Sequence, residues 1–281
     1  MSRYRVEHVT GFKYQSMVSA SYNEARMFAV RDDSQLVFSS KLEIVPKGSV
    51  HEYFDYFGTR TAMFEILEPH SEMTLTSTTL VEVRPRDGVS VTNLNWDAIA
   101  PRVSSDLALT DAVAQTRRTA PPAELVKFAK KKAAELSPNE TAMEICRFVY
   151  DRVKYQHGVT GVHSVATEAW TKQIGVCQDF AHLVIGALRA VGLPARYVSG
   201  YLHPQLEPVI DETVVGESHA WVEWFSGDWF AFDPTNDVAI ADRHIVVGRG
   251  RDYDDVAPLR GVYAGPFASE LFVSVQITRE V

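Results

Sequence analysis

Cys177 lies where helix chemistry could turn a thiol into a nucleophile. Apolar residues follow it at three- and four-residue steps from Phe180 to Val191, and this spacing predicts an amphipathic helix. Gly192 and Pro194 then match the usual signals for the end of a helix. Cys177 therefore falls in the first helical turn, where free backbone N–H groups and the positive end of the helix dipole stabilise a thiolate. A cysteine in this place is a candidate nucleophile if the chain also supplies a base.

His219 and Asp233 are the candidates for the base and its orienting acid. A thiolate nucleophile needs a base within hydrogen-bond reach, and the base needs an acceptor that fixes its tautomer. His219 begins an expected strand after an expected polar loop over residues 203–218, and Asp233 ends the next strand. A tight turn over residues 226–228 makes the two strands antiparallel neighbours. The spacing therefore predicts that the imidazole and the carboxylate lie at the same end of this pair.

Each of these three residues also has a simpler structural interpretation. A cysteine at a helix start is often structural, a histidine near a strand end is usually a surface or core residue, and Asp-Pro is a common turn opener. Only the combination favours a nucleophilic site. The second cysteine, Cys146, is expected on the packed face of a helix, where a thiol behaves as a small hydrophobic group.

The elements that must position these residues fall into two parts. Residues 1–90 carry short strands with regular turn signals, among them a hairpin at Gly58, and predict a β-sandwich of about seven strands. Residues 91–120 are interpreted as a mixed connector, preceded by a turn over residues 86–88 and closed by a polar double-proline segment.

The remaining residues, 121–281, are expected to form the catalytic part. Two helices come first, and Ser137 and Glu140 predict a capping box at the start of the second. Strands are expected at five places after the Cys177 helix: 195–202, 219–225, 229–232, 244–247 and 271–277. Trp221 and Tyr201 on these strands are expected in the core rather than in a cleft.

Composition and charge narrow the function further. The chain has 281 residues, 46% of them apolar, and a formal net charge of −8. These values are typical of a soluble globule and argue against a general binder of nucleic acid or anionic membranes; the lysine run 130–132 is interpreted as a solvated helix face. No segment is apolar for long enough to span a bilayer, and the N-terminus has no signal core. With two cysteines and no disulfide framework, a cytoplasmic setting is expected.

Three motifs together resemble those of bacterial transglutaminase-like proteins, within the transglutaminase-like cysteine peptidase superfamily. They are residues 175–182, 218–223 and 232–236, in this order. Segments within the first 85 residues and within 248–263 resemble the N-terminal and C-terminal parts of the same proteins. The resemblance implies an α+β fold, with an N-terminal β-sandwich followed by a papain-like, transglutaminase-like core of helices packed on an antiparallel sheet.

The same resemblance implies a Cys-His-Asp triad made of Cys177, His219 and Asp233. The thiolate would attack an amide or ester carbonyl to give a thioester, which water or an amine releases; we expect hydrolysis, with transamidation as the alternative. A backbone N–H near Cys177 would stabilise the oxyanion, with Tyr155 and Gln178 as auxiliary candidates. The expected partner is a peptide or protein substrate, or a small amide, with no cofactor and no metal. The oligomeric state is left open.

Three other functions are consistent with parts of the sequence. A zinc site could be written from Cys177, His182, His219 and Asp233, but the chain has no Cys-x-x-Cys pair, and His182 is expected to be structural. A non-catalytic interaction module would not need the three motifs. Acyl transfer from a thioester donor such as coenzyme A would use the same triad, but the sequence has no evident phosphate cradle.

Overall fold

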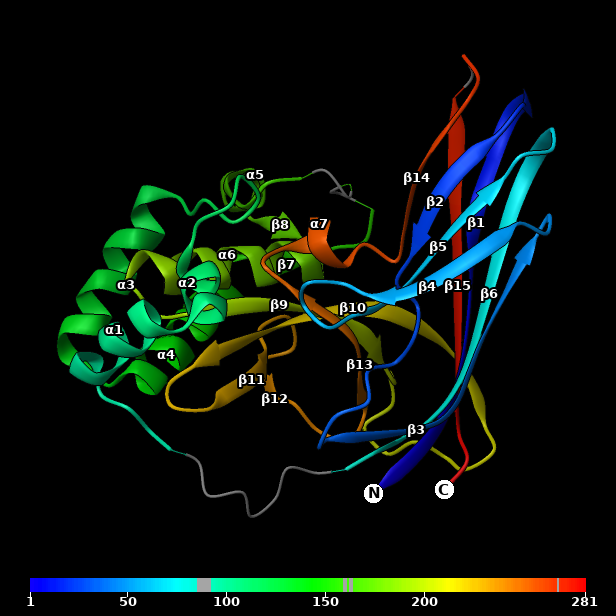
Figure 1. Cartoon of the computed structure of the whole chain (residues 1–281). Helices are drawn as coiled ribbons and strands as arrows, with labels where there is room; N and C mark the ends of the chain where they lie inside the picture. The colour runs from blue at the N-terminus through cyan, green and yellow to red at the C-terminus, as the bar shows by residue number, and fades with distance from the viewer. Residues whose placement is uncertain (85–91, 159–160, 162–163, 267) are drawn as a thin grey trace.

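Long alternating strands build a sheet that holds both ends of the chain (Figure 1). In the computed structural model, which describes residues 1–84, 92–158, 161, 164–266 and 268–281, β1 (Ser2–Val18) lies between β6 (His70–Val83) and β15 (Ser269–Arg279). Next to β6 lies β3 (Gln35–Val45). Tyr4 and Val6 of β1 are buried on the same face, because the side chains of a strand alternate between its two faces.

A second sheet packs on the first and completes the sandwich. Its order is β14 (Leu259–Tyr263), β2 (Ser21–Ala25), β5 (Arg60–Ile66) and β4 (Ser49–Phe54). The expected hairpin joins β4 to β5, and Gly58 takes the positive φ of 77° that such a turn requires. Phe64 and Met73 belong to the core between the sheets. The predicted N-terminal β-sandwich is confirmed in this respect.

The C-terminal strands differ from the expected division of the chain. The sequence assigns residues 121–281 to the catalytic part, but β14 pairs with β2 and β15 pairs with β1. Tyr4 lies opposite Arg279, for example. Pairing between residues so far apart leaves no local signal, so alternation alone predicts that a strand forms but not which sheet it joins.

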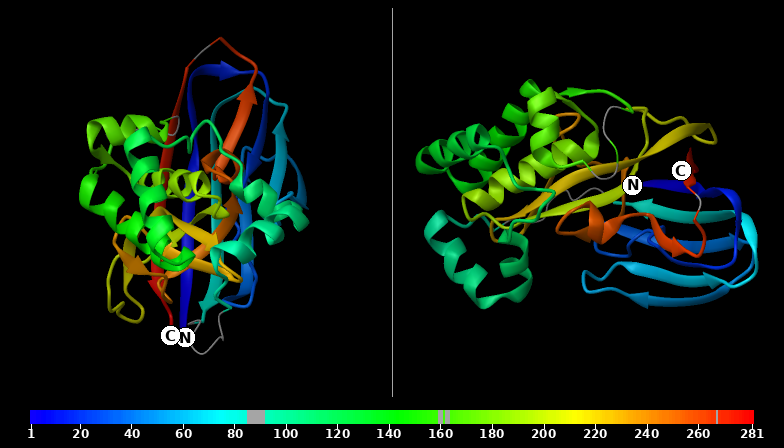
Figure 2. Two further views of the ribbon diagram at one scale, coloured as in Figure 1. Left: turned by 90° about the vertical axis from the view of Figure 1, so that its left-hand side faces the viewer. Right: turned by 90° about the horizontal axis from the view of Figure 1, so that it is seen from above.

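Helices cover one side of the remaining strands. The helices are α3 (Ala123–Glu135), α4 (Pro138–Arg152), α5 (Ala166–Lys172) and α6 (Cys177–Ala190). The strands are β9 (Ala195–Leu202), β10 (Thr213–Phe225), β11 (Trp229–Asp233), β12 (Val238–Ala239) and β13 (His244–Gly250). Figure 2 shows the helices gathered on one side of the molecule and the sandwich on the other. The α+β class expected from the sequence is confirmed.

α6 is the central helix of this part. Every residue from Gln178 to Arg189 is buried, and a helix that is apolar nearly all round belongs in a core. The capping box of Ser137 and Glu140 starts α4 as predicted, and Cys146 is completely buried. The helices of the described part of the chain include none with the length and apolar character that a bilayer crossing requires.

The expected connector contains two helices. α1 (Trp96–Ser105) and α2 (Leu107–Val113) are capped by the side chains of Asn95 and Asp106. Their shortness, and Pro101 inside α1, weaken the periodic signal by which helices are predicted from sequence. The turn expected at residues 86–88 lies outside the described residues.

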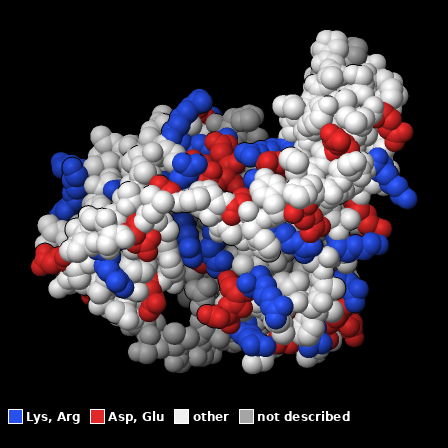
Figure 3. All heavy atoms as spheres, in the orientation of Figure 1, with Lys and Arg blue, Asp and Glu red and all other residues white. Residues whose placement is uncertain are grey.

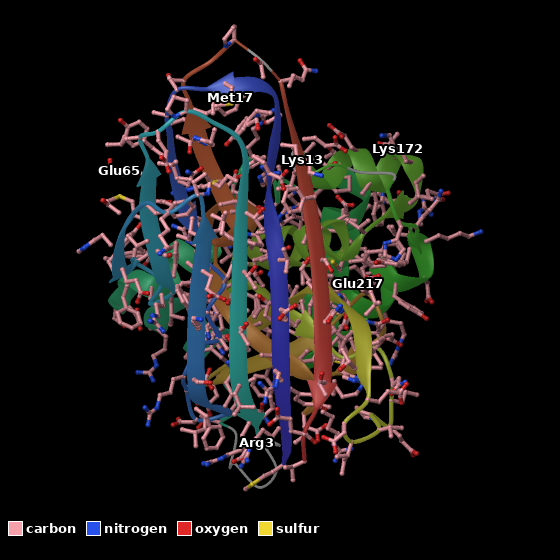
Figure 4. All side chains as sticks on the ribbon, turned by 90° about the vertical axis from the view of Figure 1, so that its right-hand side faces the viewer. Arg3, Lys13, Met17, Glu65, Lys172 and Glu217 are labelled. Atoms are coloured by element: carbon pink, nitrogen blue, oxygen red, sulfur yellow. The ribbon has the colours of Figure 1, made fainter. Side chains whose placement is uncertain are left out.

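β10 is longer than predicted and unites the two parts. The sequence predicts a loop over residues 203–218, whereas β10 begins at Thr213. Its first residues, up to Gly216, pair with β15, and its later residues, from Glu217, pair with β9 (Figure 4). The expected loop was wrong over residues 213–218, because residues 213–216 pair with β15, a strand far away in the sequence that leaves no local signal.

The visible charged side chains form no continuous area of one sign. On the face shown in Figure 3, acidic and basic side chains are interspersed. The N-terminal part contains an ion pair in which Arg26 Nε lies 3.2 Å from Asp55 Oδ2.

We predict that Gly186→Ala destabilises the fold. In an exposed helix this change stabilises by about 1 kcal/mol, but a Cβ at Gly186 would lie 1.8 Å from the backbone oxygen of Thr119. Overpacking of this kind costs roughly 1–3 kcal/mol, which urea denaturation would measure. Gly161→Ala is the control, because among the described residues a Cβ there meets nothing within 4 Å. Equal stability of the two variants would contradict the prediction.

Candidate active site

Cys177 is the first residue of α6, as the sequence predicts. The carboxylate of Asp179 accepts the backbone N–H of Val176 at 2.9 Å and caps the helix. Gly175 leaves room for this carboxylate, because a Cβ there would lie 2.9 Å from Asp179 Oδ2. The Asp179 carboxylate is bound by the N–H of Val176, and the thiol of half-buried Cys177 lies at the start of α6, which is the positive end of the helix dipole.

The structure brings His219 and Asp233 together. In the register of β10 and β11, Val222 lies opposite Phe232, so His219 and Asp233 fall at the same end of the strand pair. His219 Nε2 lies 2.7 Å from Asp233 Oδ2, and both side chains are almost completely buried. Cys177 lines the same cleft as His219, and its thiol interacts electrostatically with the imidazole. Cys177, His219 and Asp233 therefore form one cluster.

The charges of this cluster favour an imidazolium at His219. Burial by itself would lower the pKa of His219, but the hydrogen bond with Asp233 and the electrostatic interactions with Cys177 and Asp233 raise this pKa to about 10. Burial would raise the pKa of Asp233, yet hydrogen bonds from His219, His244 and Asn236 keep it well below its usual range. The carboxylate is thus ionised, and the imidazole beside it is held in the charged form that stabilises a thiolate.

His244 is a neighbour of Asp233 that the sequence analysis missed. Its Nδ1 accepts the backbone N–H of Ala241 at 3.2 Å, so Nε2 carries the proton and donates to Asp233 Oδ2 at 3.4 Å. Burial lowers the pKa of His244, which keeps the ring neutral. The expected strand 244–247 carried no hint of this role, because β13 reaches Asp233 only through the tertiary fold.

Asn236 and a turn hold the carboxylate from the other side. Asn236 Nδ2 donates to Asp233 Oδ2 at 2.7 Å, and the backbone N–H of Thr235 donates to Oδ1 at 2.9 Å. Asp233 is therefore fixed by neutral donors as well as by His219. Asn236 was within reach of sequence reasoning, because it lies in the motif 232–236.

A cleft of about 470 Å³ opens onto Cys177 and His219. The auxiliary candidates Tyr155 and Gln178 both line it. The hydroxyl of Tyr155 lies 3.4 Å from Glu217 Oε2, and burial and the charges of Cys177 and Glu217 raise the pKa of Tyr155. The phenol therefore keeps its proton, which it donates to Glu217, another residue that lines the cleft.

His182 lies apart from this cluster. Its Nε2 accepts the backbone N–H of Tyr253 at 3.2 Å, and burial lowers the pKa of His182 to about 3. Trp221 and Tyr201 are buried and do not line the cleft, as predicted. Within the described ranges, no three His, Cys, Asp or Glu side chains are grouped so that they could hold a metal ion. The four residues of the zinc interpretation are therefore not assembled.

We predict that the His219 ring titrates near pH 10 and that Asp233→Asn lowers its pKa, because the largest favourable contact of the imidazolium is lost. Because the pKa of His219 is higher in the folded protein than its unfolded value of about 6.5, protonation of this ring stabilises the fold. This stabilisation is complete below about pH 6.5 and disappears as the pH rises through 10. NMR titration of the ring protons measures the shift. A His219 pKa that is the same with and without the Asp233 carboxylate would contradict the assignment.

Two family descriptions match the chain. "Transglutaminase-like superfamily" covers residues 126–234, which include Cys177, His219 and Asp233. "Bacterial transglutaminase-like N-terminal region" covers residues 4–82, which correspond to β1–β6.

Individual proteins are similar over the whole chain or over parts of it. An uncharacterized protein of Mycobacterium leprae is 40% identical over 279 residues, 99% of each chain. A protein-glutamine gamma-glutamyltransferase of Pseudomonas aeruginosa is 36% identical over 84 residues, 28% of this chain and 13% of that protein. The crystal structure of a candidate cysteine protease from Cytophaga hutchinsonii has a TM-score of 0.77 and 23% identity, and the likeness covers 99% of this chain and 90% of that one. This last likeness shows a shared fold.

Proposed function

The chain belongs to the transglutaminase-like superfamily, a cysteine-based acyl-transfer fold, and we propose that it hydrolyses an amide or peptide bond through a thioester at Cys177. One observation carries the proposal. The imidazole of His219 makes a hydrogen bond with a buried, ionised Asp233, and it lines an open cleft together with Cys177 at the start of α6. This arrangement suits nucleophilic catalysis by a cysteine.

Acylation uses the charged form of the pair. The thiolate of Cys177 attacks the carbonyl carbon, so a C–S bond forms and the π electrons move to oxygen. Backbone N–H groups at the start of α6 and the hydroxyl of Tyr155 are the donors that we assign to this oxyanion. The imidazolium of His219 gives its proton to the leaving nitrogen, the C–N bond breaks, and an amine departs.

In deacylation the proton moves in the opposite direction, from the acceptor water to His219. His219, now neutral, takes a proton from water, the hydroxide attacks the thioester carbon, and the C–S bond breaks to release a carboxylic acid. Asp233 binds Nε2 of the ring and so favours the neutral tautomer that accepts at Nδ1. His244 and Asn236 donate hydrogen bonds to Asp233, which they keep ionised and in place.

Transamidation is the second candidate. It differs only in the acceptor, because an amine takes the place of water in the second step. The similarity of 84 residues to the P. aeruginosa glutamyltransferase favours it. We propose hydrolysis, with water as the acyl acceptor, as the first candidate, and the experiment below distinguishes water from an amine.

The test is capture of the acyl adduct on Cys177. The protein is incubated with a peptide library and a biotinylated primary amine, quenched in acid and measured by intact-protein and peptide mass spectrometry. We expect an adduct on Cys177, free peptide acids and no adduct in Cys177→Ala. Cys146→Ala is the control, since that thiol is buried and its pKa is raised by burial.

The products distinguish the alternatives. Biotinylated peptides in place of free acids would support transamidation. A wild-type protein without adducts, whose Cys177 reacts with iodoacetamide no faster than in His219→Ala, would indicate a non-catalytic module and overturn the proposal.

A further inference from the structure

The strand β15 has one edge that is only half used. Along its whole length, from Ser269 to Arg279, it pairs with β1. On the other side β10 covers only Val275 to Thr278. In the part of the chain that the structure describes, residues 269–274 therefore have a strand on one side only, and Figure 4 shows β10 leaving the edge near Glu217.

The backbone groups of Leu271 and Val273 face this open edge. Along a strand, the N–H and C=O groups of alternate residues point to opposite neighbours. The carbonyl of Arg279, an odd-numbered position, faces the β10 side, where it accepts the N–H of Asp211. The carbonyl of Phe272, an even-numbered position, faces β1, where it accepts the hydroxyl of Thr10. The pairings of β15 show no register shift, so odd-numbered positions continue to face outward. An open edge with free backbone groups is a template for another strand.

This edge runs directly into the cleft of Cys177. Val273, Ser274 and Val275 line the same cavity as Cys177 and His219. Gly216 is the last residue of β10 that pairs with β15, and His219 lies three residues further along the same strand. At a rise of ~3.3 Å per residue this is a separation of about 10 Å along the strand. A chain lying on the edge would thus reach the nucleophile within a few residues.

Apolar side chains border the open edge. Leu271 is 47% exposed and Val273 is 57% exposed. Both project from the same face of the strand, because they are two residues apart. An added strand could bury them with its own apolar side chains at every second position.

We propose that the edge of β15 from Leu271 to Ser274 binds an extended segment of the substrate as an added strand, in the place that β10 leaves. The inference rests on the proposed function and narrows its substrate class. The substrate would be an extended polypeptide with apolar residues at alternate positions, recognised mainly through its backbone. A small amide would reach Cys177 without using this surface.

Val273→Pro tests the edge without disturbing β1. Proline removes the N–H that faces the open edge, and proline is tolerated at such positions of edge strands. Val273→Thr is the matched control, because it keeps the N–H and the β-branched shape. Both changes are made in Cys177→Ala protein, and binding of a fluorescein-labelled octapeptide is followed by anisotropy; the peptide has valine at every second position and threonine or lysine between.

We expect Val273→Pro to weaken binding about tenfold, as loss of a backbone hydrogen bond would, and Val273→Thr to leave it within about twofold. Separately, proteins with Cys177 intact are assayed on acetylated dipeptide amides and on the same amides extended by six residues. We expect extension to raise kcat/KM in the wild type and not in Val273→Pro, so that the ratio of the extended to the dipeptide kcat/KM falls to about one in this variant.

The outcomes separate this inference from the proposed function. If short amides are cleaved but the octapeptide does not bind, or binds Val273→Pro equally well, the proposed substrate binding at the β15 edge is overturned and the proposed hydrolysis stands. If Val273→Pro weakens octapeptide binding but no amide is turned over, binding at the edge is supported and the proposed hydrolysis is overturned. A wild-type dimer in solution that Val273→Pro dissociates would show a second copy on the edge and overturn the inference.

Discussion

His219→Ala is expected to lower kcat/KM for amide hydrolysis by about 10³-fold, within the ~10²–10⁴-fold range of general acid–base catalysis. Two losses combine in this variant. The thiolate of Cys177 loses the neighbouring imidazolium, whose pKa of about 10 keeps it charged at neutral pH, and the leaving nitrogen loses its proton donor. The measurement is steady-state hydrolysis of the peptides identified by adduct capture.

The control must show that the variant is folded and still carries its thiol. His51→Ala, an exposed histidine of β4, should keep wild-type activity. Alkylation of Cys177 at high pH should still occur in His219→Ala, because the thiol itself is intact. A variant that is folded and as active as the wild type would remove His219 from the mechanism, whatever its distance from Asp233.

Glu223→Gln is expected to lower the free energy of unfolding by about 3 kcal/mol. Glu223 is 1% exposed and accepts hydrogen bonds from Arg196 Nε at 2.6 Å and Arg249 Nε at 3.0 Å. Burial by itself would lower the pKa of Arg249, but the charges of Glu223 and Asp32 raise it. Removing one partner of a buried ion pair costs about 3–5 kcal/mol, because the other charge stays buried without full compensation.

This network also joins the two parts of the fold. Arg249 on β13 donates to Glu223 on β10 and, at 3.0 Å, to Asp32 from the N-terminal part. Glu43→Gln is the matched control, because its pair with Lys41 is exposed and should contribute under about 0.5 kcal/mol. Urea denaturation monitored by tryptophan fluorescence compares the two variants; equal midpoints would contradict the assignment of Glu223.

Local patterns predicted the elements of this protein well. The alternation in β1, the hairpin at Gly58, the capping box at Ser137 and the helix from Cys177 depend on neighbours within a few residues, so a sequence can reveal them. The juxtaposition of His219 and Asp233 was also within reach, because a short turn joins their strands and fixes the register.

What the sequence by itself determined is therefore the family, the α+β class, and which residues begin α6 and end β11. Only the tertiary structure decided that β14 and β15 join the N-terminal sandwich, that β10 bridges the two parts, and that His244 supports Asp233. The physical reason is the separation in sequence over which each interaction acts. Helix caps and tight turns act within a few residues, whereas the partner of a strand edge or of a buried carboxylate is chosen by chain closure over many residues.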